Sequence, residues 1–208
     1  MIKVTLKDGI VHEYKDNITI YEVAKSLSDG LARVACAGEL NGELVDLRTE
    51  ITEDSQLNIL TFDSEGGKHA YWHTSTHIMA QAVKRLFPKA KLAIGPAIDN
   101  GFYYDFDVEK TFTPEDLEKI EAEMKKIIKE KNEIVRFTLP RKEALEKMIA
   151  MGEDYKVELI ENLPEDAIIS FYSQGDFIDL CAGPHLMNTG SVKAYKLLSI
   201  AGAYWRGD

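Results

Sequence analysis

The chain has 208 residues, 45% of them hydrophobic, and a formal net charge of -10. This length exceeds one typical domain and predicts two domains with buried cores. The acidic charge argues against a general nucleic-acid-binding surface. In an enzyme that acts on one end of an RNA, however, another domain can provide most of the RNA binding. No apolar run reaches the roughly 18 residues that cross a bilayer, and two cysteines are too few for a disulfide scaffold. We therefore expect a soluble, cytoplasmic protein with reduced cysteines and no membrane partner.

Residues 1–62 have the pattern of a small β-rich unit. Alternating apolar residues predict four strands, at residues 2–6, 10–14, 33–37 and 56–60. Asp8-Gly9 is a hairpin turn signal between the first two strands. Apolar residues at helical spacing predict one helix that Thr19 caps and Gly30 ends. A hairpin, a helix and further strands in this order suggest a ubiquitin-like β-grasp domain, in which Cys36 would be a buried structural cysteine within a strand.

Residues 63–208 are predicted to form a second, larger α+β domain. Residues 63–68 are polar and glycine-rich, so we expect a linker there. Helical spacing then predicts three helices, at residues 71–87, 114–131 and 141–151. Pro88 would end the first of these helices, and Thr113 would cap the second.

The strands of the second domain are expected in two stretches. Gly-Pro and Asn-Gly turns accompany an aromatic strand within residues 93–106. A Gln174-Gly175 turn joins two strands within residues 168–180. The second of these strands would deliver Asp179 and Cys181 to its end.

Two pairs of potential ligands, about a hundred residues apart, are the most informative feature of the sequence. His73 and His77 are separated by four positions, which places both imidazoles on one face of the predicted helix. Cys181 and His185 have the same separation, but Gly183-Pro184 breaks any helix there and predicts a turn. Two such pairs make either a tetrahedral zinc site or a pocket rich in acid, base and hydrogen-bonding groups.

Over essentially its whole length the chain resembles the N-terminal part of bacterial threonyl-tRNA synthetases. The motifs that carry the resemblance are His73–His77, Ile94–Asp105, Asp179–His185 and Ala201–Asp208. The resemblance implies a TGS domain at 1–62 and an editing domain, shared in outline with alanyl-tRNA synthetases, at 63–208. The final Trp-Arg-Gly-Asp looks like a boundary within a longer protein. A class II catalytic core, which would use ATP and zinc to ligate threonine to tRNA(Thr), and an anticodon-binding domain would then lie outside this chain.

The resemblance further implies that the chain hydrolyses serine mistakenly esterified to tRNA(Thr). Serine offers the same hydroxyl as threonine and lacks one methyl group. A missing methylene is worth only about 1–3 kcal/mol, which is too little for accurate translation, so a second site has to remove the smaller product. That site should accept serine and exclude threonine by sterics.

Site residues follow from the same resemblance, position by position. His73 is expected to handle protons near the ester, because the pKa of imidazole lies near neutral pH. Lys156 is expected to hold the attacking water and to stabilise the oxyanion, and Asp179 to bind the α-amino group. The rest of the pocket is assigned to His77, Tyr104, Cys181 and His185. Asp99 is a lesser candidate for its wall, with turn formation as the alternative, and Tyr104 is also compatible with core packing.

The resemblance leaves the metal and the class of protein open to test. Threonyl-type editing domains work by positioning water, so we expect no required metal or cofactor for editing. The alternative is zinc held by His73, His77, Cys181 and His185, as alanine-editing relatives bind it. Two other functions compete: a free-standing alanyl-type deacylase, and a non-catalytic binding module stabilised by structural zinc.

The expected partner is the 3′ end of tRNA(Thr) carrying serine. The full-length enzyme is expected to be a homodimer through the absent core, and this chain alone a monomer.

Overall fold

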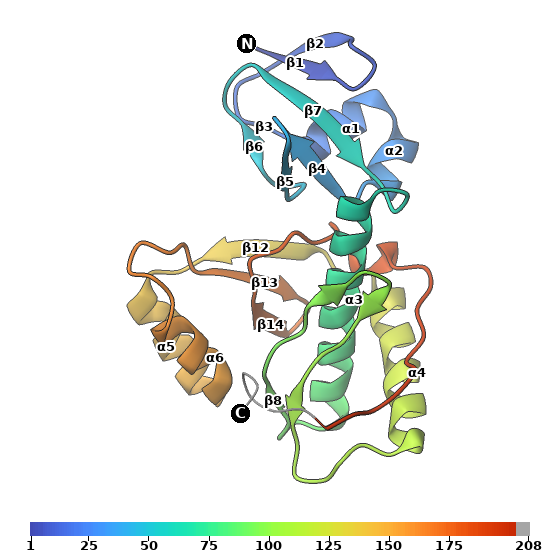
Figure 1. The fold of residues 1–208 in the computed structure, drawn as a ribbon, viewed down its shortest axis with the longest axis vertical. Coiled ribbons are helices and arrows are strands. Elements are labelled where there is room, and N and C mark those ends of the chain that lie inside the picture. The colour runs from blue at the N-terminus through green and yellow to red at the C-terminus, as the bar shows by residue number, and fades with distance from the viewer. Residues whose placement is uncertain (203–208) are drawn as a thin grey trace. The chain divides into compact units, whose positions relative to one another are not determined.

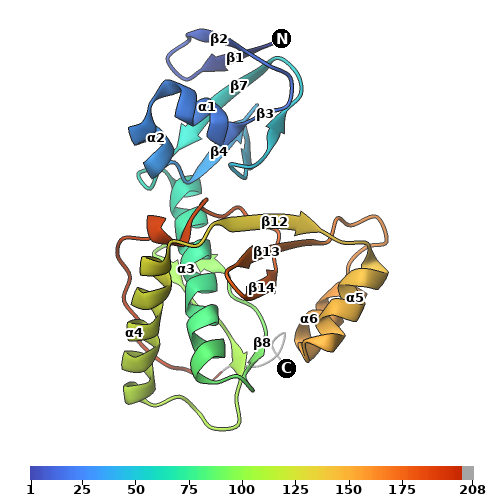
Figure 2. The ribbon, with the colours of Figure 1, turned by 180° about the vertical axis from the view of Figure 1, so that it is seen from behind.

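The computed structural model describes residues 1–202, which fold into two compact units. Unit 1 consists of Met1–Thr74 and Gly183–Met187, and unit 2 of Ser75–Ala182 and the residues from Asn188 onward. Figures 1 and 2 show the helices and strands from opposite sides. Within residues 1–202, no helix has the length and hydrophobicity that a membrane span requires. The division into functional domains at residues 62 and 63 stays a prediction, because these units are defined by packing alone.

Unit 1 is built on a five-stranded sheet with the order β2-β1-β7-β4-β5. Its strands are β1 (Ile2–Leu6), β2 (Val11–Tyr14), β4 (Ala37–Leu40), β5 (Glu43–Val45) and β7 (Ser55–Leu60). β1 and β7 are parallel neighbours, whereas the other pairs are antiparallel. Parallel neighbours need a crossover connection, and helix α1 (Ile20–Leu27) lies in it. This is the predicted β-grasp arrangement, and the predicted α+β class is confirmed.

The core of unit 1 lies between α1 and the sheet. Thr19 caps α1 as predicted, because its Oγ1 accepts a hydrogen bond from the Glu22 N–H at 3.1 Å. A short pair, β3 (Ile18–Thr19) and β6 (Glu50–Ile51), flanks the helix. The buried side chains of the core are Ile2, Val4, Ile20, Val23, Ala24, Ala35, Leu47, Ile51 and Leu57.

The predictions for residues 28–37 are wrong in two details. Gly30 does not end a helical stretch, because it lies within a second helix, α2 (Asp29–Val34). Ser28 interrupts the helices instead: it has extended backbone, and its Oγ accepts from the Leu31 N–H at 2.9 Å. The predicted strand at 33–37 begins only at Ala37, so Cys36 lies just before β4 and not within a strand. Cys36 is buried as predicted, and burial raises the pKa of its thiol to about 11.

The predicted linker at residues 63–68 is also wrong, because helix α3 (Glu65–Leu86) begins within it. Its glycines are there for close packing. A Cβ on Gly67 would lie 1.7 Å from the carbonyl oxygen of Thr61, and one on Gly66 would lie 2.8 Å from Leu60 Cδ1. Ser64 starts the helix by accepting a hydrogen bond from the Gly67 N–H at 3.1 Å. α3 ends before Pro88, as predicted.

Unit 2 contains a three-stranded antiparallel sheet with the order β12-β13-β14. Its strands are β12 (Ile134–Thr138), β13 (Ser170–Gln174) and β14 (Phe177–Leu180). Gly175, at a φ of +58°, makes the predicted turn between β13 and β14. Two small ladders precede the sheet: β8 (Lys91–Leu92) with β11 (Phe106–Asp107), and β9 (Ala97–Ile98) with β10 (Gly101–Phe102).

Helices complete unit 2. They are α4 (Pro114–Glu130), α5 (Arg141–Ala150), α6 (Asp154–Glu161) and the 3₁₀ turn η1 (Thr189–Ser191). Thr113 and Asp116 form a capping box at the start of α4, as the sequence predicts. Arg85 links α3 to α4 through Glu130, with nitrogen-to-oxygen distances of 3.0 and 2.9 Å; Figure 1 shows the two helices running alongside each other. α5 and α6 form a helical pair beside the sheet, around a core of Ala144, Met148, Ile160, Ile169 and Phe171.

Helix α6 presents Lys156 on its buried side. Lys156 and Ile160, one turn apart, are both buried. Arg141 fixes the far end of α6 by donating to the carbonyl oxygens of Ile160 and Leu163. A lysine held on the inner face of an anchored helix has little conformational freedom, which is what a positioned cation requires.

Candidate active site

Helix α3 carries the histidine pair in the predicted way. His73 and His77 are one turn apart, so both imidazoles leave the same face of the helix. His77 is 2% exposed, and the three intervening residues, Thr74, Ser75 and Thr76, are fully buried. The boundary between the units falls between Thr74 and Ser75, so His73 belongs to unit 1 and His77 to unit 2.

In unit 2 a buried cluster forms around the carboxylate of Asp179 on β14. Tyr104 donates its hydroxyl to Asp179 Oδ2 at 2.7 Å. Lys156 Nζ lies 3.0 Å from Asp179 Oδ1, and His77 Nε2 lies 3.4 Å from Oδ2. None of these four residues is more than 8% exposed. The structure thus brings together four of the predicted site residues, which we call the Asp179 cluster.

The cluster has a defined charge state near neutral pH. Burial alone would raise the pKa of Asp179, but the charge of Lys156, with His77 and the Tyr104 hydroxyl, outweighs burial and leaves this pKa below its usual value. Burial lowers the pKa of His77 to about 4, so its imidazole is neutral. Burial beside Asp179 raises the pKa of Tyr104 well above its usual value, so its phenol stays a donor. The cluster therefore contains one carboxylate and one ammonium with two neutral groups.

Asp179 Oδ1 retains the capacity to accept a hydrogen bond. Lys156 Nζ forms an ion pair with this oxygen at 3.0 Å, which favours the carboxylate, and the second lone pair of the oxygen can accept from a further donor. Buried carboxylate oxygens normally accept hydrogen bonds. A ligand that brings an ammonium group would satisfy this oxygen.

Gly95, which sequence reasoning missed as part of the site, leaves the space that the ring of Tyr104 occupies. This ring stacks on Phe106, with centroids 4.7 Å apart, and Lys156 Nζ lies 5.5 Å from the centroid of the Tyr104 ring. A Cβ on Gly95 would lie only 2.1 Å from Tyr104 Cδ2. The Gly-Pro signal indicated only a turn at Gly95. In the structure the absence of a side chain at Gly95 also allows the Tyr104 ring to pack against its backbone.

In unit 1, Thr74 fixes the orientation of His185. Thr74 Oγ1 donates to the carbonyl oxygen of Ala70 at 2.9 Å and accepts from the Leu186 N–H at 2.9 Å. Its single proton is therefore used, so the 3.1 Å contact with His185 Nδ1 requires His185 to be the donor. This network assigns His185 the Nδ1–H tautomer and leaves the lone pair on Nε2. The rings of His73 and His185 stack, with centroids 4.3 Å apart.

The remaining predicted residues lie in irregular backbone. Cys181 follows β14 and is partly buried; its N–H donates to the carbonyl oxygen of Ser170, and Ser170 Oγ donates back to its carbonyl oxygen. The segment 181–186 is not helical, as Gly183-Pro184 predicted. Asp99 lies in the exposed turn between β9 and β10, which is the turn-forming role proposed as its alternative.

The donor set suits a metal ion by its chemistry. Within the described part of the chain, the group of side chains that could hold one consists of His73, His77, Cys181 and His185. Three imidazoles and a thiolate are ligands that zinc accepts, and the tautomer of His185 leaves Nε2 as its ligand atom. The residues therefore fit zinc, and the zinc alternative stays open to experiment.

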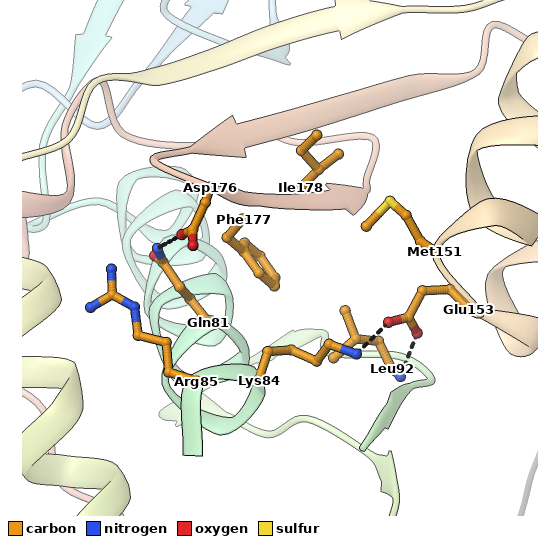
Figure 3. Close-up of a pocket in the computed structure, with 9 residues that line it drawn as sticks. All are labelled: Gln81, Lys84, Arg85, Leu92, Met151, Glu153, Asp176, Phe177 and Ile178. Carbon is orange, nitrogen blue, oxygen red and sulfur yellow. Dashed lines mark hydrogen bonds and ion pairs between the residues drawn. The ribbon is translucent and has the colours of Figure 1, made fainter. Parts of the chain in front are cut away.

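A pocket of about 180 Å³ lies further along α3 and β14 (Figure 3). Figure 3 shows that Glu153 bonds both Lys84 and the backbone of Leu92. Its Oε1 accepts from Lys84 Nζ at 2.8 Å, and its Oε2 accepts from the Leu92 N–H at 2.9 Å. Arg85 at the rim pairs with Glu130. Because these charges are compensated by protein groups, the pocket is best understood as support for α6. Glu153 immediately precedes this helix and so helps to place Lys156.

Comparisons with known proteins agree with this architecture. Residues 2–61 match the TGS domain, and residues 169–208 match the threonyl and alanyl tRNA synthetase second additional domain. Together these matches define a region of an aminoacyl-tRNA synthetase.

Similar curated proteins are threonine–tRNA ligases. Those of Acetivibrio thermocellus and Clostridium botulinum (strain Loch Maree) are 68% and 63% identical over all 208 residues, which make up 33% of each relative. That of Caldanaerobacter subterraneus subsp. tengcongensis is 63% identical over 205 residues, covering 99% of this chain and 32% of the relative. The chain belongs to the threonine–tRNA ligase family and corresponds to its N-terminal region, so the resemblance is confirmed. It spans about a third of the length of the relatives it matches.

Proposed function

We propose that this chain is an editing hydrolase that releases serine mistakenly esterified to tRNA(Thr). The Asp179 cluster supports this proposal most directly, because it combines a carboxylate that can accept from an ammonium with a fixed cation and neutral hydrogen-bonding groups. Aminoacyl esters carry a free α-ammonium group next to the scissile carbonyl. A buried carboxylate beside a buried lysine suits that pair of features.

Each residue has a distinct role in the proposed reaction. Asp179 binds the α-ammonium group, and Tyr104 orients the carboxylate. Lys156 holds the attacking water and stabilises the negative charge that develops on the carbonyl oxygen. His73 takes the proton that the attacking water loses and transfers it to the ribose oxygen that leaves when the ester bond breaks.

Three further side chains complete the proposed pocket. Neutral His77 positions water or the serine hydroxyl, and Cys181 and His185 contribute to its wall. Editing by water positioning needs no metal in this proposal.

The reaction complements a synthetic site that cannot reject serine well. The difference of one methyl group is worth about 1–3 kcal/mol in binding, which is too little for the synthetic site alone. The editing pocket therefore discriminates a second time, by excluding the larger threonine. Threonine ligation, with its requirement for ATP and zinc, belongs in this proposal to the rest of the ligase. The partner is the aminoacylated 3′ end of tRNA(Thr) in the cytoplasm, and the whole ligase acts as a homodimer.

The test is hydrolysis of serylated and threonylated tRNA(Thr) by this chain, with and without a chelator. We expect release of serine, little release of threonine, and no effect of the chelator. The variants His73→Ala and Lys156→Ala should lose serine release. Their matched controls, His12→Ala and Lys142→Ala, should keep it.

The chelator separates the proposal from zinc-dependent functions. Loss of serine release on chelation, restored by zinc, would establish a zinc-dependent hydrolase. Absence of release, together with one bound zinc per chain and unfolding on its removal, would support the structural-zinc module. Preferential release of alanine from alanyl-tRNA would favour the deacylase of alanyl type.

A further inference from the structure

A salt bridge in the β-grasp sequence holds the backbone that carries His185. Asp46 and Arg48 lie between β5 and β6, and Arg48 Nη1 is 2.8 Å from Asp46 Oδ1. Arg48 donates through Nη1 to the carbonyl oxygen of His185 at 3.2 Å and through Nη2 to that of Leu186 at 2.8 Å. Asp46 Oδ2 accepts from the His185 N–H at 3.0 Å. These partners are separated by 137 to 139 positions in sequence.

The other contacts of this segment are equally specific. The Leu186 N–H donates to Thr74 Oγ1, so both N–H groups and both carbonyl oxygens of residues 185 and 186 are bonded to side chains of unit 1. Leu186 is 1% exposed, and Met187 packs against the core of the β-grasp sheet. A segment without regular secondary structure needs such partners for its buried backbone groups.

Arginine suits this task better than lysine. Its planar guanidinium can donate in two directions at once, here to two successive carbonyl oxygens, while Asp46 fixes its orientation. The salt bridge is only slightly exposed, with 16% of the Arg48 side chain and 10% of the Asp46 side chain accessible. Its geometry is therefore weakly disturbed by solvent and salt.

We propose that Asp46 and Arg48 are positioning residues for editing that act through His185. They hold residues 183–187 so that the imidazole of His185 keeps its Nδ1–H bond to Thr74 and therefore its orientation. This inference rests on the proposed function for its consequence in catalysis. Whether Asp46 and Arg48 hold the backbone of residues 183–187 in place can be tested without a catalytic assay.

The experiment compares Arg48→Ala, Arg48→Lys and Asp46→Asn with the wild-type chain and with Arg33→Ala, an exposed arginine in the same unit. Hydrogen exchange of residues 183–187 reports the hold on the segment. We expect exchange at least about tenfold faster in Arg48→Ala, an intermediate increase in Arg48→Lys, and none in the control. Imidazole nitrogen shifts should show His185 as the Nδ1–H tautomer in the wild type and as a mixture in Arg48→Ala.

Kinetics then separate positioning from mere stability. Serine release per folded molecule should fall about tenfold in kcat with little change in KM, because the reacting groups and not the bulk of the tRNA contact are disturbed. Unchanged exchange and tautomer in Arg48→Ala would overturn the proposal, as would faster exchange with unchanged kcat.

The same variants give a result when Arg48→Ala does not fold or when the wild-type chain releases no serine. If Arg48→Ala does not fold, Arg48→Lys and Asp46→Asn decide by the same criteria. If the wild-type chain releases no serine, the proposed function is wrong, and exchange and tautomer alone support or overturn the hold on His185.

Discussion

Substitution of Gly95 by alanine should damage the site by moving one side chain. Gly95 does not have a positive φ, so an alanine there acts through its Cβ alone. That Cβ would lie 2.1 Å from Tyr104 Cδ2, and ordinary van der Waals contact begins near 3.4 Å. The ring therefore has to move by more than an ångström, while Phe106 stacks on it at 4.7 Å. A shift of that size breaks the 2.7 Å hydrogen bond from Tyr104 to Asp179.

The size of the expected effect follows from that hydrogen bond. A hydrogen bond to a charged group contributes about 1.5–3 kcal/mol, which corresponds to a loss of roughly 10- to 100-fold in serine release if the carboxylate is misplaced in the transition state. Crowding of the core should also lower the free energy of unfolding by about 1–3 kcal/mol. Gly30→Ala is the matched control, because its Cβ meets only ordinary contacts at 3.8 Å or more.

The assay is serine release by Gly95→Ala, Tyr104→Phe and the double variant, each corrected for the folded fraction. Tyr104→Phe removes the hydroxyl without steric strain, so the two single variants should have similar effects. The double variant should be little worse than either one, because both changes remove the same bond. Wild-type activity in Gly95→Ala, or fully additive losses in the double variant, would refute this reasoning.

Three further outcomes are expected from the described contacts. Asp179→Asn should abolish serine release and lower the melting temperature, because it leaves Lys156 as an uncompensated buried charge; adding Lys156→Met should restore stability but not activity. The low pKa of His77, about 4 in the fold against 6.5 in the unfolded chain, should make stability fall by roughly 3 kcal/mol as pH drops from 6.5 to 4, and urea titrations of His77→Gln should lack that slope. Gly67→Ala should destabilise strongly in thermal melts, because its Cβ would meet the Thr61 carbonyl oxygen at 1.7 Å; a merely flexible linker would tolerate it.

The parts of the fold that could be predicted are those with local causes. Asn41 and Gly42 turn between β4 and β5 with φ values of 50° and 87°, which asparagine tolerates and glycine, without a Cβ, adopts freely. The capping box at Thr113 depends on residues three positions apart. Such signals are complete within a few residues of sequence, so no knowledge of the tertiary structure is needed to interpret them.

The errors lie where packing or capping gives a residue a role that its composition alone does not indicate. Gly66 and Gly67 indicate a flexible linker by themselves, but the close approach of Leu60 and Thr61 makes them helical packing residues. The first residues of the strand predicted at 33–37 belong to helix α2 instead. Ser28 starts this helix, which places Ala32 in the core. Both deciding partners are near in sequence, but neither composition nor periodicity shows that Thr61 packs on Gly67 or that Ser28 has extended backbone.

The same distinction applies to the site. The spacing of His73 and His77 is visible in sequence because one helix turn relates them, whereas Thr74 between them looks like a spacer. In the structure Thr74 makes three hydrogen bonds and so determines which nitrogen of His185 carries the proton. The backbone of His185 is fixed in turn by Asp46 and Arg48. A motif can indicate which residue belongs to a candidate site, but the protonation and orientation of that residue depend on partners that only the fold brings to it.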